Sequence, residues 1–200
     1  MEPRILIDGR SGSGKTQFAA ALAGAWPEAQ LVRLDDLYPG WDGLDAGSMA
    51  VHAAATGVFT GYRWQSWDWE REQPAHWHEL DPARPIIVEG CGALSMANKR
   101  MSTWAVWIEL DEVTRKRRAL LRDGDSYAPH WNRWAEQEER FIAREHPAAI
   151  ADAIIDGADV LRDIAQWGRT FRGERTLAKS TDFPGGRGPK ASQERSIQTS

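Results

Sequence analysis

The sequence predicts an α/β fold, a three-layer sandwich in which a parallel sheet of about five strands carries helices on both faces. Two observations lead to this prediction. Short apolar runs alternate along the chain with longer stretches that have a helical pattern. The run "PIIVEG" at residues 85–90 is apolar without interruption up to its glutamate, which is typical of a strand that a parallel sheet buries on both faces.

The individual elements follow from the same patterns. The first apolar run ends at a glycine-rich turn, and an alanine-rich stretch that favours a helix follows the turn and closes at Pro27. Strands are expected at residues 4–8, 29–34, 85–90, 103–110 and 151–156. Helices are expected between them, at residues 16–26, 45–56, 111–123 and 131–145. In the last helix Trp134, Glu138 and Phe141 share one stripe, which predicts packing in the core.

Length and composition limit the function classes. Two hundred residues suit one domain, expected at residues 1–171, and residues 172–200 are polar and rich in Gly, Pro and Ser, which predicts a disordered tail. The net charge of −4 implies no basic surface for nucleic acid, and no apolar run approaches the roughly 20 residues that span a bilayer. The chain starts without a signal-peptide pattern and has one cysteine, Cys91. We therefore expect a cytoplasmic protein without nucleic-acid or membrane partners.

Residues 9–16 read "GRSGSGKT" and match the pattern G-x-x-x-x-G-K-[ST] between an expected strand and an expected helix. Glycines let the backbone turn tightly and point its N–H groups at phosphate oxygens, and the helix start adds positive charge. Lys15 is expected to contact the β- and γ-phosphates, and Thr16 to ligate Mg²⁺. This motif predicts a P-loop NTPase fold. The expected nucleotide-binding residues are Gly9, Ser11, Gly12, Ser13, Gly14, Lys15 and Thr16.

Other sequence features narrow the kind of P-loop protein. GTPases usually carry an N-K-x-D motif, and the nearest string, "NKRM" at residues 98–101, lacks the acid. Transporter ATPases and helicases are longer chains with further motifs. The remaining class is the small kinases, which use ATP and Mg²⁺ and add an acceptor site and a lid.

Carboxylates are expected at the ends of two strands, where ligands bind in parallel sheets. Asp35 and Asp36 follow the second expected strand in "LDDLYPGWDGL", and Glu89 ends the third. Asp35 or Asp36 can accept the proton of an acceptor hydroxyl or hold Mg²⁺ through water, and Glu89 can hold Mg²⁺ in the same way. The choice between Asp35 and Asp36 stays open, because a one-residue shift in the strand end exchanges them.

Residues 111–128 are expected to form a lid. Arg115, Arg118 and Arg122 are spaced by three and four residues and therefore share one helical face. In a small kinase such arginines close over the adenine and the transferring phosphoryl group. We expect Arg118 and Arg122 to act in catalysis and Arg115 to contact the nucleotide. The alternative is a solvated basic helix face.

Four strings together resemble the uridine kinase and phosphoribulokinase group of P-loop kinases: "IDGRSGSGKT", "LDDLY", "WDW" at residues 67–69 and "IIVEG". The resemblance covers roughly residues 4–155. It implies that Asp35, with Tyr38, matches the family's catalytic base motif. It also implies that "WDW" is the counterpart of a Tyr-Asp-Phe turn, which would place Trp67, Asp68 and Trp69 on the acceptor. Arg63 is included among the expected substrate-binding residues.

The acceptor itself is left open by the sequence. Uridine kinases follow the base motif with Asp-x-Pro, whereas this chain has "WDGLDAG" at residues 41–47, so a different acceptor pocket is expected. We expect transfer of the ATP γ-phosphoryl group to a hydroxyl of a small molecule, with a nucleoside-like acceptor favoured. A sugar, a cofactor precursor or an antibiotic is an alternative acceptor. A second hypothesis is a nucleotide-binding regulatory ATPase or switch without a small-molecule acceptor.

Overall fold

The central sheet of the computed structural model, which describes residues 2–173, has five parallel strands in the order β2-β5-β1-β6-β7. The strands are β1 (Arg4–Gly9), β2 (Gln30–Arg33), β5 (Ile86–Glu89), β6 (Trp104–Glu109) and β7 (Ala153–Asp156). Every residue of β1 and β5 is buried, and for β5 the uninterrupted apolar run before Glu89 predicts this. The predicted five-stranded parallel sheet is confirmed.

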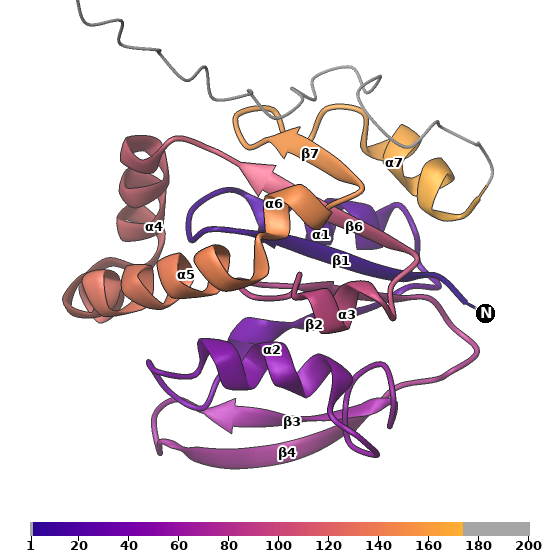
Figure 1. Ribbon diagram of the computed structural model, residues 1–200, viewed down its shortest axis with the longest axis horizontal. Coiled ribbons are helices and arrows are strands. Elements are labelled where there is room, and N and C mark those ends of the chain that lie inside the picture. Colours follow the sequence, from indigo (N-terminus) through magenta and orange to yellow (C-terminus); the bar gives the residue numbers. More distant parts are fainter. Residues whose placement is uncertain (1, 174–200) are drawn as a thin grey trace, which may run out of the picture.

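Helices cover both faces of this sheet (Figure 1). On one face α1 (Lys15–Gly24) and α7 (Ile164–Phe171) pack against Ile5 and Ile7 of β1. On the other face α2 (Leu44–His52) and α5 (Trp131–Glu145) pack against Leu6. Neighbouring residues of β1 thus point to opposite faces, as the period of a strand requires. The three-layer α/β sandwich is confirmed.

The remaining elements lie around the sheet ends. They are η1 (Leu34–Asp36), α3 (Met96–Lys99), α4 (Glu112–Tyr127), η2 (Ala128–His130) and α6 (Pro147–Ile150). Figure 1 shows α4 and α5 at the end of the sheet toward which β1 runs. The helix expected at 111–123 continues to Tyr127 through a kink at Gly124, which has φ 53° and ψ −134°.

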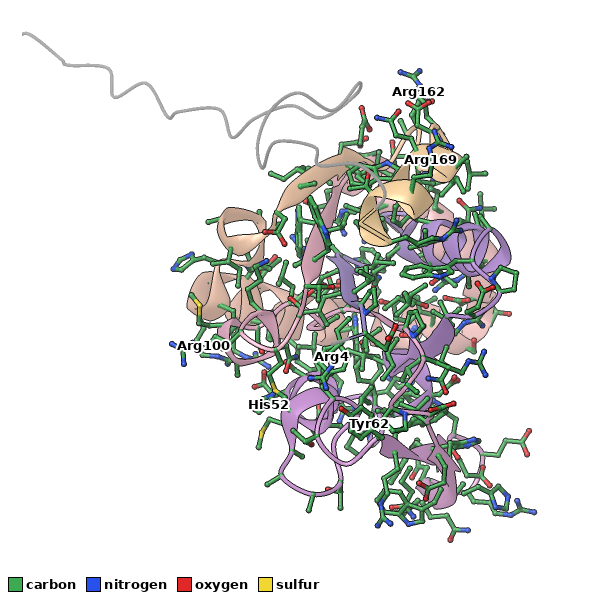
Figure 2. The ribbon with its side chains drawn as sticks, turned by 90° about the vertical axis from the view of Figure 1, so that its right-hand side faces the viewer. Arg4, His52, Tyr62, Arg100, Arg162 and Arg169 are labelled. Carbon is green, nitrogen blue, oxygen red and sulfur yellow. The ribbon has the colours of Figure 1, made fainter. Side chains whose placement is uncertain are left out.

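A two-stranded antiparallel hairpin was not predicted. It consists of β3 (Arg63–Asp68) and β4 (Gln73–Glu79) and lies below α2 in Figure 1. At its root, Arg4 of β1 donates a hydrogen bond from Nη2 to the hydroxyl of Tyr62 over 2.7 Å; both residues are labelled in Figure 2. The arginine thus ties the hairpin to the central strand.

Two further sequence predictions concern the C-terminal tail and membrane-spanning segments. The tail expected at residues 172–200 lies, from residue 174 on, outside the described residues. Within residues 2–173, none of the helices is both long and apolar enough to cross a membrane.

Candidate active site

The phosphate loop between β1 and α1 depends on its glycines. Gly12 has φ +80°, and a Cβ atom there would lie 2.1 Å from the carbonyl oxygen of Arg115. Gly14 has φ +105° and directly precedes Lys15, the first residue of α1. Because Gly14 has no side chain that could cap the helix, the first N–H groups of α1 are left for an anion. The loop therefore has the backbone shape that the motif predicts.

Lys15 is buried in this loop, and its Nζ lies 3.5 Å from the carbonyl oxygen of Arg10. Burial alone would lower the pKa of Lys15. The acidic groups of Cys91, Glu89 and Asp35 around it outweigh burial and raise the pKa above its ordinary value. Lys15 therefore keeps its positive charge at neutral pH, next to the open N–H groups.

Two buried polar atoms beside Lys15 have no hydrogen-bond partner among the described residues. They are the Oγ of Ser13, which is fully buried, and the Oε1 of Glu89, which is 1% exposed. Buried polar atoms in folded proteins almost always have a partner, so such exceptions need an explanation. Ser13 Oγ lies beside Gly9 at the end of β1. Glu89 lies within electrostatic range of Lys15, so a cation beside a bound phosphate would explain its free oxygen.

Glu89 and Thr16 fit a Mg²⁺ ion. Burial raises the pKa of Glu89 to about 7, and the nearby Thr16 side chain opposes part of that rise. Among residues 2–173 no group of three or more His, Cys, Asp or Glu side chains could enclose a metal. Mg²⁺ usually keeps several waters and takes one or two carboxylates plus phosphate oxygens, so a hydroxyl and a free carboxylate oxygen suit it.

Asp35 and Asp36 follow β2 in η1, and both side chains are exposed. They face different surroundings. The charge of Asp35 acts on Lys15, Glu89 and Arg122. Asp36 instead has Arg33 and His78 as its cationic neighbours, and burial together with repulsion by Asp35 raises its pKa. Of the two candidates, Asp35 is the one that lies with the phosphate loop.

The three arginines of the expected lid have different contacts. Arg115 is 3% exposed and donates hydrogen bonds to the carbonyl oxygens of Leu110 and Ser11 over 3.1 and 3.2 Å. Arg115 thus holds the loop backbone, and its expected contact with the nucleotide stays a prediction. Arg118 donates to the carbonyl oxygen of Gly157 over 2.8 Å, and Arg122 pairs with Asp123.

Glu138 of α5 is a site residue that sequence reasoning missed. It is 3% exposed, and its Oε1 accepts the backbone N–H of Ser11 over 2.7 Å while its Oε2 accepts Arg10 Nε over 2.9 Å. Glu138 is buried like Trp134 and Phe141, as the stripe predicts, but its carboxylate bonds to the phosphate loop. The Ser11 N–H is taken by this carboxylate, and the expected role of Ser11 in binding the nucleotide stays a prediction. The sequence carries no local signal for the contact between Ser11 and Glu138, because the two residues are 127 positions apart.

Two of the expected acceptor contacts are corrected. Tyr38 is 2% exposed, and its hydroxyl donates to the carbonyl oxygen of Cys91 over 2.7 Å, so the ring belongs to the core. Arg63 begins β3, and its guanidinium lies over the ring of Trp77 at 4.2 Å. At about 3.3 Å per residue, Arg63 is roughly 16 Å from the Asp68 end of the same strand.

The other end of the hairpin does reach the site. Trp69 is 38% exposed, and its Nε1 donates to the carbonyl oxygen of Asp35 over 3.0 Å. The Nε1 of Trp67 is buried without a partner among residues 2–173. Asp68 accepts the N–H groups of Glu70 and Arg71, each over 3.0 Å, and pairs with the Arg71 side chain. Trp67 and Asp68 belong to a strand and not to the expected turn, and Asp68 closes the hairpin instead of facing a ligand.

Trp41 connects this hairpin end to the end of α4, a role that the sequence did not reveal. Its ring stacks on His130 at 4.1 Å and on Tyr127 at 5.6 Å, and it contacts Trp69 at 5.1 Å. Aromatic stacks of this kind add to burial energy. The "WDGLDAG" stretch thus provides an aromatic bridge between the expected acceptor side and the expected lid.

Comparison with known proteins agrees with this geometry at the level of fold. No family model matches the sequence, and no curated protein matches it. Among solved structures, a possible uridine kinase from Bacillus stearothermophilus superposes with a TM-score of 0.53 and 16% identity over 76% of this chain and 88% of that chain. The protein therefore has the fold of a small P-loop kinase.

Two further solved structures are similar at a lower level. One is a putative fructose transport system kinase from Silicibacter sp. TM1040, with a TM-score of 0.46 and 19% identity over 75% of this chain and 85% of that chain. The other is the shikimate kinase from Acinetobacter baumannii, with a TM-score of 0.48 and 14% identity over 88% of this chain and 97% of that chain.

Proposed function

We propose that this protein is a small-molecule kinase that transfers the γ-phosphoryl group of ATP to a hydroxyl. The observation that carries this proposal is the meeting of four groups at one sheet edge. Lys15 and Thr16 come from the phosphate loop, the unpartnered Glu89 oxygen ends β5, and Asp35 follows β2. This set supplies a phosphate clamp, ligands for Mg²⁺ and a base for the acceptor, which are the parts that phosphoryl transfer needs.

The residues have the following roles in the proposed reaction. The N–H groups of the loop and the Lys15 ammonium hold the β- and γ-phosphates. Thr16 and Glu89 would hold Mg²⁺, which supplies charge neutralisation between those phosphates when bound. Asp35 takes the proton of the acceptor hydroxyl, whose oxygen forms a bond to the γ-phosphorus. The bond between that phosphorus and the β–γ bridging oxygen breaks, and ADP leaves.

Asp35 is assigned as the base in preference to Asp36 because its charge acts on Lys15 and Glu89, whereas Asp36 faces Arg33 and His78. Arg122 also lies within electrostatic range of Asp35. We assign Arg122 and Arg118 to the transferred phosphoryl group. Positioning and fixed charges would supply most of the rate enhancement.

The acceptor is proposed to lie beside Trp69. This ring is partly exposed and bonded to the backbone of Asp35, so a molecule stacked on it would lie next to the base. The free Nε1 of Trp67 is a donor for an acceptor oxygen. A flat ring next to a carboxylate suits nucleosides and sugars alike, and we favour a nucleoside-like acceptor.

The test is ADP formation by the purified protein with ATP and Mg²⁺, measured against a panel of nucleosides, sugars, cofactor precursors and antibiotics. A no-acceptor control is run alongside. We expect one class of hydroxyl compound to raise the rate well above that control. Slow hydrolysis that no compound accelerates would contradict the kinase proposal and favour a nucleotide-dependent switch.

Asp35→Asn and Asp36→Asn form a matched pair for the assignment of the base. The first should reduce transfer by about 10²–10⁴-fold while leaving ATP affinity nearly unchanged, because only the proton acceptor is lost. The second should reduce transfer much less. Near-normal turnover by Asp35→Asn would remove the assignment.

A further inference from the structure

All three polar groups of Ser11 are bound by residues of α4 and α5. Its N–H donates to Glu138 Oε1 over 2.7 Å, its carbonyl oxygen accepts from Arg115 Nη1 over 3.2 Å, and its Oγ accepts from the Tyr127 hydroxyl over 3.0 Å. Ser11 lies in the first half of the phosphate loop, between Gly9 and Gly12. A loop residue with its backbone and side chain all engaged has lost most of its conformational freedom.

These contacts are shielded from water. Ser11 is 8% exposed, Tyr127 6%, and Arg115 and Glu138 3% each. Hydrogen bonds to charged groups are stronger than neutral ones, and a low-dielectric surrounding makes the loss of one partner costly. The bonds from Glu138 and Arg115 to Ser11 each involve a charged side chain, so they restrain the loop strongly.

Glu138 restrains the neighbouring residue as well. Its second oxygen accepts Arg10 Nε over 2.9 Å. Burial would raise the pKa of Glu138, but the bonds from Ser11 and Arg10 and the charge of Lys15 lower it. The carboxylate is therefore ionised at neutral pH and accepts from two successive loop residues.

The three side chains also connect the loop to the arginine-bearing helix. Arg115 lies in the first turn of α4 and Tyr127 is its last residue, so both ends of that helix are attached to Ser11. Arg118 and Arg122 lie between these two attachments. The backbone of Arg115 also contacts the loop, since its carbonyl oxygen occupies the space that a Gly12 Cβ would need.

We propose that Arg115, Tyr127 and Glu138 are positioning residues that hold Ser11, keep the phosphate loop in its nucleotide-binding shape and set the place of the helix that carries Arg118 and Arg122. We call these three residues the Ser11 clamp. None of the three contacts the nucleotide in this proposal. This proposal deepens the proposed function and rests on it for nucleotide binding. It predicts that substitutions at residues outside the phosphate site lower the affinity for the nucleotide.

The experiment compares Glu138→Gln, Glu138→Ala, Tyr127→Phe and the control Glu139→Gln. Glu139 is the neighbouring carboxylate on α5; it is exposed, and its Oε1 lies 3.5 Å from Arg10 Nη2. The first readout is MgADP affinity by calorimetric titration, which needs no acceptor. The second is amide hydrogen exchange of peptides covering residues 9–16 in the nucleotide-free protein.

We expect Glu138→Gln to weaken MgADP binding about tenfold and Tyr127→Phe about threefold, since each removes part of the charge-assisted or hydroxyl contact. Both should speed exchange in residues 9–16, and Glu139→Gln should change neither readout. Glutamine fills the space of glutamate, so Glu138→Gln should melt above Glu138→Ala and still bind weakly. A role in packing alone would instead let glutamine restore the affinity.

The outcomes separate the two proposals. Wild-type affinity together with wild-type exchange in both Glu138→Gln and Tyr127→Phe would overturn the clamp. A wild-type protein that fails to bind MgADP would overturn the proposed function, and the exchange data would then decide the clamp without it. If Glu138→Ala does not fold, the two conservative variants still give the answer.

Discussion

The two halves of the phosphate loop differ in how their polar groups are satisfied. In the first half Ser11 makes three hydrogen bonds to α4 and α5, and Arg10 bonds to Glu138. In the second half Ser13 Oγ is buried without a partner among the described residues, and so is Glu89 Oε1 at the end of β5. The loop is therefore fixed by protein on one side and left unsatisfied on the other.

The two halves of the phosphate loop therefore have different roles. A group that is already bonded to protein cannot change its partner without loss, so the first half determines shape. A buried group without a partner is costly until something binds it, so the second half favours a ligand. Substitutions in the second half should damage catalysis, whereas those in the first half should damage affinity.

The largest effect is expected for Lys15→Ala. Removal of the ammonium leaves the phosphate charge unopposed in a water-poor site, so transfer should fall by about a thousandfold. Because the cation is buried beside Glu89 and Asp35, its loss also leaves those carboxylates unpaired. The measurement is kcat for ADP formation, with a melting curve to check the fold. A variant that keeps more than a tenth of wild-type kcat would contradict the proposed contact of Lys15 with the phosphates.

The second effect is expected for Glu89→Gln, on the unsatisfied side of the comparison. The amide cannot replace a carboxylate as a Mg²⁺ ligand, so kcat should fall by about a hundredfold and the Mg²⁺ concentration for half-maximal rate should rise. A titration of the rate with Mg²⁺ checks this. An unchanged Mg²⁺ requirement would mean that Glu89 has another role.

The same variant should alter the pH dependence of stability. The pKa of Glu89 is about 7 in the folded protein against 4.5 ordinarily, because the side chain is buried. The folded state thus binds the proton more tightly than the unfolded state. Its contribution of about 3 kcal/mol is complete below pH 4.5 and lost as the pH rises through 7.

Melting curves between pH 5 and pH 8 test this prediction. Glu89→Gln should lose less stability over that range than the wild type, and at pH 8 it should melt at a higher temperature. Some dependence should remain, because burial also raises the pKa of Asp8 to about 6. Parallel curves for the two proteins would show that Glu89 does not titrate as described.

The smallest effects come from two glycines. Gly12→Ala meets the Arg115 carbonyl oxygen at 2.1 Å with a positive φ, so we expect a cost of about 1–3 kcal/mol and weaker MgADP binding. Gly24→Ala, in α1, meets no atom within 4 Å and should stabilise the protein by about 0.4–1 kcal/mol. Denaturant unfolding measures both. Equal effects would show that the close approach of Arg115 does not constrain the loop.

The fold and the phosphate-loop shape of the second half of the loop could be predicted from local patterns. The apolar run before Glu89 and the glycines before Lys15 mark strand ends and a helix start, and parallel strands bring such ends to one edge. The sequence pattern could not decide whether Asp35 or Asp36 is the base. Their different surroundings depend on η1, whose turn separates the two side chains.

The features that escaped prediction depend on long-range packing. Glu138 shares a helical stripe with Trp134 and Phe141, and helical phase alone cannot tell a core contact from a loop contact. Arg115 is spaced to share a face of α4 with Arg118 and Arg122, yet its side chain donates to the carbonyl oxygen of Ser11 in the loop. The hairpin was hidden because β3 and β4 are only partly buried and a register shift between Gln65 and Trp67 interrupts their alternation.

The clamp on Ser11 also has a consequence during synthesis on the ribosome. The loop is made first, and Arg115, Tyr127 and Glu138 follow it by 104, 116 and 127 residues. At about 5–20 residues per second, Glu138 is added roughly 6–25 seconds after Ser11. Until Glu138 is added, the nascent chain carries the "GRSGSGKT" motif without the full set of side chains that hold it. The motif and its restraint are thus separated in time as well as in sequence.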